Sequence, residues 1–98
     1  MTKKAIYTLK KPVTIDGQNY TEVDLSDLDK LTGEDILAIE QEMQSDGYVI
    51  AGMAELSKAY LLYIAARAAK INVQILKKFP ISDISKITAM AQTFLLRA

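Results

Sequence analysis

The chain of 98 residues contains no cysteine and no histidine. It therefore has no thiol nucleophile, no disulfide, no imidazole base and none of the usual zinc or haem ligands. The longest apolar run, AYLLYIAA at residues 59–66, is too short to cross a bilayer, and no N-terminal segment resembles a signal peptide. We expect no membrane partner, no metal and no cofactor, and a cytoplasmic location fits this composition.

Residue types that support catalysis or phosphate binding are present, but their spacing is wrong for either. The four glycines, at positions 17, 33, 47 and 52, stand alone, so the chain has no glycine-rich phosphate loop. The acidic string at 24–29 lacks the glycine and the closing glutamate of a calcium loop. Glu40 and Glu42 lie two residues apart on a predicted helix and so do not share a face. We predict no catalytic, metal-binding or cofactor-binding residue, and a protein that is not an enzyme.

Each part of the chain carries charges of almost only one sign, although the net charge of the whole chain is zero. Residues 1–11 carry four lysines and no acid, residues 12–57 carry eleven acids and one base, and residues 58–98 carry seven bases and one acid. The segregation favours either head-to-tail association or two halves that neutralise each other locally. The C-terminal bases are dispersed among apolar positions without an arginine cluster or an aromatic platform, so we expect no nucleic-acid partner.

The N-terminal quarter predicts an antiparallel β-hairpin. Asp16-Gly17 is a strong signal for a two-residue turn, because glycine accepts the positive φ that a type I′ turn requires and aspartate tolerates it. This turn places Val13 opposite Tyr20, with both side chains on one face.

A bulge at Pro12 improves the pairing on the far side of the hairpin. Proline cannot donate a ladder hydrogen bond, and one extra residue near it brings Leu9 opposite Val23 and Tyr7 opposite Leu25. The predicted buried face of the hairpin therefore consists of Tyr7, Leu9, Val13, Tyr20, Val23 and Leu25.

The remainder of the chain predicts helices. Leucines three residues apart at 25–31 indicate a loose helical connector, Thr32 begins a helix as its N-cap, and Ser82 caps the last one. The predicted fold is α+β: a single domain of residues 1–98, with an N-terminal hairpin followed by a bundle of three to four helices. The expected bounds are 1–25 for the hairpin, 33–46, 53–70 and 83–97 for the main helices, and 73–78 for a short helical turn.

The order of these pieces resembles a known family. Tyr-x-Leu-x-Lys-Pro-Val, the Asp-Gly turn and Tyr-Thr-Glu-Val-x-Leu are followed by Leu-Thr-Gly-Glu-Asp-Ile, then by Glu-Leu-Ser-Lys-Ala-Tyr-Leu and Ile-x-x-Ile-x-x-Met-x-Gln-x-Phe-Leu-Leu. From about Tyr7 to Leu96 this is similar to the small tail assembly chaperones of long-tailed phages and prophages, particularly those of Gram-positive hosts.

The resemblance implies a non-enzymatic protein of the host bacterial cytoplasm that is missing from the mature virion. Such proteins coat the tape measure protein and help recruit tail tube protein. Many also occur in a longer, frameshifted form, of which this chain resembles the short one. The alternatives are a phage structural or connector protein, or another small protein-binding adaptor.

The 53–70 helix has more apolar perimeter than one helix and a hairpin are expected to cover, which indicates a partner surface or a homo-oligomer. The alternative interpretation, that the apolar residues of this helix simply form part of the core, also stays open. The candidate partner-binding residues lie on this helix and on the last one: Tyr60, Leu61, Tyr63, Ile64, Met90, Phe94 and Leu95.

Overall fold

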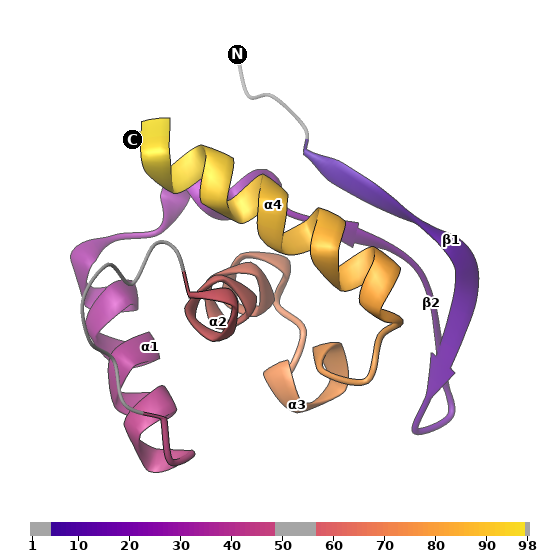
Figure 1. The fold of residues 1–98 in the computed structure, drawn as a ribbon, viewed down its shortest axis with the longest axis horizontal. Helices are drawn as coiled ribbons and strands as arrows, with labels where there is room; N and C mark the ends of the chain where they lie inside the picture. Colours follow the sequence, from indigo (N-terminus) through magenta and orange to yellow (C-terminus); the bar gives the residue numbers. More distant parts are fainter. Residues whose placement is uncertain (1–4, 49–56, 98) are drawn as a thin grey trace.

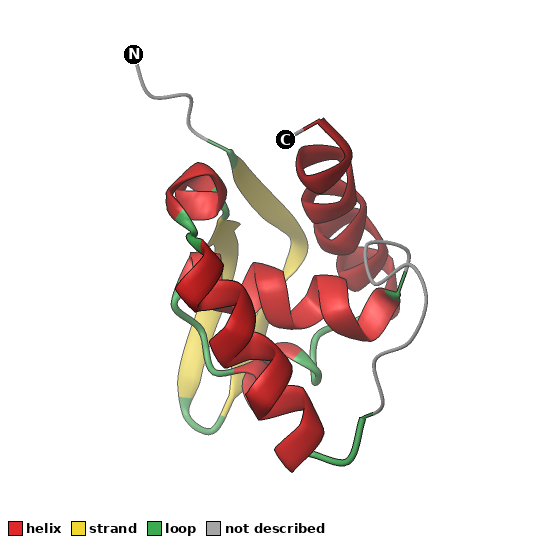
Figure 2. Ribbon diagram, turned by 90° about the vertical axis from the view of Figure 1, so that its left-hand side faces the viewer, coloured by secondary structure: helices red, strands yellow, loops and turns green. Residues whose placement is uncertain are grey.

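The computed structural model describes residues 5–48 and 57–97, and it shows the predicted α+β fold (Figures 1 and 2). A two-stranded antiparallel sheet is followed by helices, with α2 in the middle of the molecule between α1 and α4. The predicted start of the long helix, at residues 53–56, lies outside the described residues. The elements are β1 (Ile6–Ile15), β2 (Gln18–Asp24), the 3₁₀ helix η1 (Ser26–Lys30), α1 (Gly33–Ser45), α2 (Lys58–Ala69), α3 (Val73–Leu76) and α4 (Ile81–Arg97).

The hairpin has the predicted turn. Asp16 and Gly17 both adopt positive φ, 52° and 80°, as a type I′ turn requires, and Val13 pairs with Tyr20. All six residues of the predicted buried face are at least partly buried, and Ile15, which the prediction omitted, joins them at 8% exposure.

The predicted pairing beyond the bulge is wrong. Tyr7 pairs with Val23 and Thr8 with Glu22, so the register changes between Thr8 and Val13. Four residues of β1 thus lie opposite one residue of β2, which is three extra residues where the sequence predicted one. Leu9 therefore does not face Val23, and Tyr7 does not face Leu25.

Contacts with α4 give the physical reason for this longer irregularity. The backbone N–H of Lys10 donates to Asp83 Oδ1 at 3.3 Å, and the Tyr7 hydroxyl donates to the same oxygen at 2.6 Å. A strand whose donor bonds a distant helix leaves the ladder locally. The hairpin is therefore shaped by α4 as well as by its own sequence.

Local signals determine most helix ends. The Asp35 carboxylate accepts hydrogen bonds from the backbone N–H and the hydroxyl of Thr32 at the start of α1, and the positive φ of Gly47 follows its end. Ser57 Oγ accepts from the backbone N–H of Tyr60 at the start of α2.

The predicted cap of the last helix is wrong. Helix α4 begins at Ile81, and the carbonyl of Pro80 accepts the N–H groups of Asp83 and Ile84, each at 3.0 Å. Ser82 is exposed within the first turn. Proline fixes its own φ near the helical value and needs no amide partner, so the helix begins directly after it.

The core surrounds α2. Tyr63, Ile64 and Ala65 are at most 2% exposed, and α2 contacts η1, α1, α3 and α4. Ion pairs of the described residues join the acidic and basic parts of the chain: Lys70 with Asp27, Arg67 with Asp35 and Lys78 with Asp16. These pairs favour the interpretation that the two halves neutralise each other locally.

Candidate functional site

An open groove of about 690 Å³ runs along one face of α4. Its first wall is a helical stripe in which residues follow one another at intervals of three, one, three, one and three positions. This spacing places all six on one face of a helix. The wall consists of Lys86, Ala89, Met90, Thr93, Phe94 and Arg97.

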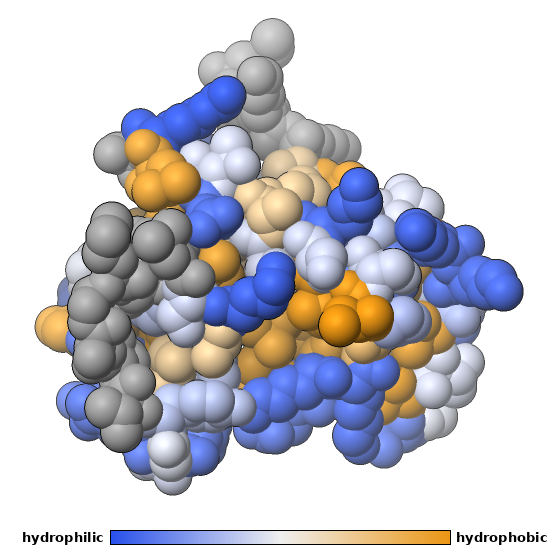
Figure 3. Space-filling view, viewed as in Figure 1, coloured by the Kyte–Doolittle hydropathy of each residue, from blue (hydrophilic) through white to orange (hydrophobic). Residues whose placement is uncertain are grey.

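The second wall comes from the other end of the chain. It is formed by the start of β1 and by the segment that joins β2 to η1: Ala5, Tyr7, Leu25, Ser26, Leu28 and Asp29. Leu25 and Leu28 are 1% and 5% exposed and make its base, while Met90 and Phe94 are half-buried opposite them. Apolar side chains also gather between hydrophilic ones on the face that α4 crosses (Figure 3). The lining is of a kind that accepts apolar groups.

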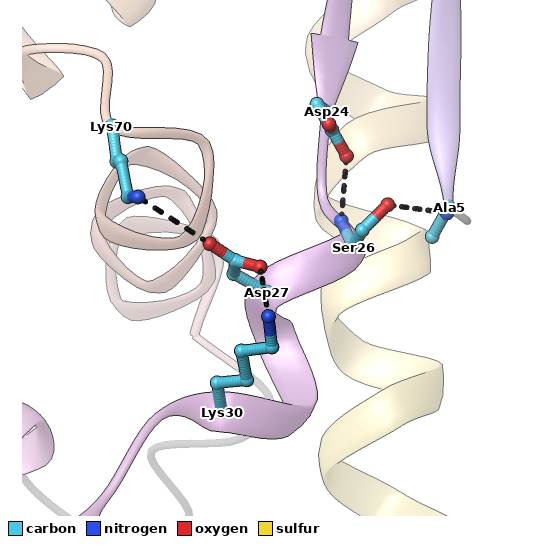
Figure 4. A network of polar contacts seen from close by, with 6 residues as sticks. All are labelled: Ala5, Asp24, Ser26, Asp27, Lys30 and Lys70. Carbon is cyan, nitrogen blue, oxygen red and sulfur yellow. Dashed lines mark hydrogen bonds and ion pairs between the residues drawn. The ribbon is translucent and has the colours of Figure 1, made fainter. Parts of the chain in front are cut away.

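A polar network holds the second wall in place (Figure 4). The backbone N–H of Ala5 donates to Ser26 Oγ at 2.9 Å, and the Leu25 N–H donates to the carbonyl of Ala5 at 2.7 Å. Ser26 in turn donates its N–H to Asp24 Oδ1 at 2.9 Å. Because these bonds tie the first strand to the connector after the second, Leu25 is held at the groove by backbone geometry.

The same η1 segment is tied to α2. Asp27 lies 3.5 Å from Lys30 Nζ and 3.6 Å from Lys70 Nζ, so one carboxylate faces two ammonium groups (Figure 4). Exposed pairs of this kind contribute little to stability. Asp27 does not line the groove; among the described residues, the acid that does is Asp29.

Asp83 joins the two walls at the base of α4. Its side chain is 1% exposed and accepts the Tyr7 hydroxyl and the Lys10 N–H. It also lies in the first turn of α4, where the helix dipole favours a negative charge. The hydrogen bond to Asp83, burial and the neighbouring negative charge all raise the pKa of Tyr7 above its usual value. Tyr7 is therefore a neutral donor at physiological pH, and it holds β1 against α4.

A second tyrosine–aspartate pair lies on the other side of α2. The Tyr63 hydroxyl donates to Asp46 Oδ2 at 2.5 Å, and the Tyr48 ring packs edge-on against Tyr63 with 5.8 Å between ring centroids. Lys77 Nζ lies 5.2 Å from the Tyr48 ring and 5.4 Å from the Tyr63 ring. Burial, then the hydrogen bond and charge of Asp46, raise the pKa of Tyr63 well above 10. This cluster anchors the end of α1 to α2 and α3.

The structure divides the predicted partner-binding residues into two groups. Tyr60, Leu61, Tyr63 and Ile64 are at most 5% exposed and belong to the chain's own core. Met90 and Phe94 line the groove, and Leu95 is half-buried against the core beside it. In this conformation, only the α4 residues of the predicted set are near a surface that a partner can reach; binding by any of the seven remains a prediction.

The sequence analysis missed the second wall. Two features of the sequence belonged to this wall: the three-residue spacing of Leu25 and Leu28, and the predicted place of Tyr7 on the buried face of the hairpin. Neither signal indicated that these residues meet α4.

The described residues offer neither a metal site nor a membrane-spanning helix. Residues 5–48 and 57–97 hold no group of three or more acidic, histidine or cysteine side chains that could bind a metal ion. In the same ranges, no helix has the length and apolar character needed to span a bilayer.

Comparison with known proteins gave one result. A family model described as "Phage tail assembly chaperone proteins, E, or 41 or 14" matches residues 6–96, which is almost the whole chain. No curated protein and no solved structure matched it.

Proposed function

Since this chain belongs to the family of phage tail assembly chaperones, we propose that it acts in tail assembly by binding the tape measure protein and helping recruit tail tube protein. We propose further that the activity is non-enzymatic, that it takes place in the host bacterial cytoplasm, and that the protein leaves before the virion is complete.

The groove along α4 is the observation that supports the proposed binding of the tape measure protein. An amphipathic helix docks by laying an apolar stripe into a groove of this kind, with contacts spaced at three and four residues. Helix α4 has 17 residues and is therefore about 25 Å long, which gives a partner helix several turns of contact. Recruitment of tail tube protein is proposed from the family alone.

Co-expression tests binding of the tape measure protein. The tape measure protein of the same phage should become more soluble and should co-purify with this chain. Ala89→Trp fills the groove from an exposed position, so it should abolish co-purification and leave the fold intact.

Ser85→Trp is the matched control, because Ser85 is exposed on the same helix and does not line the groove. Equal co-purification by both variants would place the contact elsewhere, and no co-purification by the unmodified chain would contradict the proposal.

Mass spectrometry of purified particles tests the proposal that the protein leaves before the virion is complete, since a chaperone should be missing from the particles.

A further inference from the structure

We propose that the groove selects a partner helix by its acidic residues, through Lys86 and Arg97 at the two ends of the α4 wall. The inference rests on the proposed function, since it takes the occupant to be an amphipathic helix of another protein. It adds the side chains that this helix must carry: two acidic residues about three helical turns apart, one at each end of an apolar stripe.

The spacing of the two cations determines how far apart the acidic side chains of the partner helix must be. Lys86 and Arg97 are eleven residues apart on one helix, which places their Cα atoms about 16 Å apart along its axis. The wall between them is uncharged and consists of Ala89, Met90, Thr93 and Phe94. The opposite wall adds one acid, Asp29. A helix that fits this groove therefore presents apolar residues in the middle, negative charge at the two ends that face Lys86 and Arg97, and no acid toward Asp29.

Both cations are available to a partner. Lys86 and Arg97 are exposed, and within residues 5–48 and 57–97 neither forms an ion pair or hydrogen bond. By contrast, Arg67 and Lys70, the basic residues at the end of α2, pair with Asp35 and Asp27. Lys86 and Arg97 are thus among the basic residues that form no ion pair with an acid within the described ranges, and they are the ones that line the groove.

A second copy of this chain is a poorer occupant. Helix α1 is its acidic helix, but its apolar residues Ile39 and Met43 are buried in the core, and Leu37 is its one large apolar side chain that is mostly exposed. Helix α4 contains one acid, Asp83, which is also buried. To place the buried residues of α1 in another molecule's groove, the fold would have to open. The open stripe of α4 would bring Lys86 and Arg97 into that groove in place of acids.

Rim charges of this kind determine selectivity more than total affinity. An exposed ion pair adds little to total affinity, but it steers encounter and penalises a partner of the wrong charge. Most of the affinity comes from the apolar stripe. The two cations decide which of several similar amphipathic helices enters the groove.

Synthetic peptides provide the test. Two amphipathic helices of about 18 residues would share one leucine stripe and differ only at two positions eleven residues apart, which hold Glu in one peptide and Lys in the other. The unmodified chain should bind the Glu peptide about tenfold more tightly at low salt. The difference should shrink at about 1 M salt, where the Debye length is about 3 Å.

Charge reversal distinguishes selectivity from a folding defect. In the double variant Lys86→Glu/Arg97→Glu the preference should invert, so that the Lys peptide binds more tightly; a misfolded protein would lose both. Lys11→Glu/Lys78→Glu makes the same change in net charge at exposed residues outside the groove and should keep the original preference.

Several results would overturn the inference. They are equal binding of the two peptides, no binding of either one, a preference that the reversal leaves unchanged, or a dimer that only the groove reversal dissociates in sedimentation. None of these bears on the proposed function, which depends on co-purification of the unmodified chain with the tape measure protein. That experiment can succeed while the charge rule fails.

Discussion

Helices α2 and α4 are both rich in apolar residues, yet the fold uses them differently. Seven of the 12 residues of α2 are buried, including Ala65, Ala66 and Ala68, whereas four of the 17 residues of α4 are buried. Neighbours surround α2, and its small side chains let them come close. On α4, one stripe packs inward and the adjacent stripe lines an open groove. Apolar content alone therefore does not identify a binding surface; the number of packing neighbours decides.

The largest expected effect tests whether α2 is purely structural. Ile64 is fully buried, so Ile64→Ala should lower the free energy of unfolding by about 3 kcal/mol, measured by urea denaturation. Leu96→Ala on α4 is the control, because Leu96 is 60% exposed, and it should change stability by less than about 0.5 kcal/mol. Similar losses in both variants would contradict the contrast between the helices.

The next effect concerns the buried end of α4. Asp83→Ala removes the acceptor of the Tyr7 hydroxyl and the Lys10 N–H, and should cost about 2 kcal/mol of unfolding free energy. Asp83→Asn keeps one oxygen acceptor and should cost less. Adding Tyr7→Phe to Asp83→Ala should cost little more, because the shared bond is already lost; full additivity in this cycle would show that the two groups do not interact.

A smaller loss of stability is expected from the open stripe of α4. Phe94 is half-buried, so Phe94→Ala should lower the unfolding free energy by about 1 kcal/mol, well below the cost at a fully buried site. Co-purification with the tape measure protein should nevertheless fall sharply. A variant that loses stability as Ile64→Ala does, while retaining its partner, would mean that α4 is core and not interface.

The smallest effect is visible only in alkali. In the folded chain the pKa of Tyr63 is raised by burial and by Asp46, so folding favours its protonated form. Stability from this group is complete below pH 10, where tyrosine is also neutral in the unfolded chain, and it decreases as the pH rises further. Urea titrations between about pH 9 and pH 12 should show a shallower decline for Tyr63→Phe than for the unmodified chain. Identical slopes would contradict this account of the pair.

Short-range signals predicted much of the fold. The Asp16-Gly17 turn and Thr32 before α1 act within a few residues, and both do what the sequence indicates. The hairpin irregularity was underestimated because it depends on Asp83, 73 residues from Lys10 and 76 from Tyr7. Contacts over such separations leave no periodic trace in a sequence.

The candidate site was predicted in part for the same reason. The helical spacing of Met90 and Phe94 was readable, since it lies within one element. The wall formed by Leu25 and Leu28 depends on how η1 and the residue before it are placed across the groove from α4, and this follows from packing around α2. The candidate residues on α2 were chosen from its composition, which counts apolar residues without counting the neighbours that cover them; that they bind a partner remains a prediction.

The hairpin irregularity also interrupts one edge of the sheet. A two-stranded sheet has two open edges, and a flat ten-residue strand such as β1 would offer a template on which further chains could pair. The break between Thr8 and Val13 divides that edge into two short pieces, and Lys10, Lys11 and Pro12 occupy the gap. Two charged side chains and one residue without an amide hydrogen make this stretch a poor site for strand addition. The same irregularity that docks β1 on α4 thus also works against edge-to-edge pairing of β1 between copies of the chain.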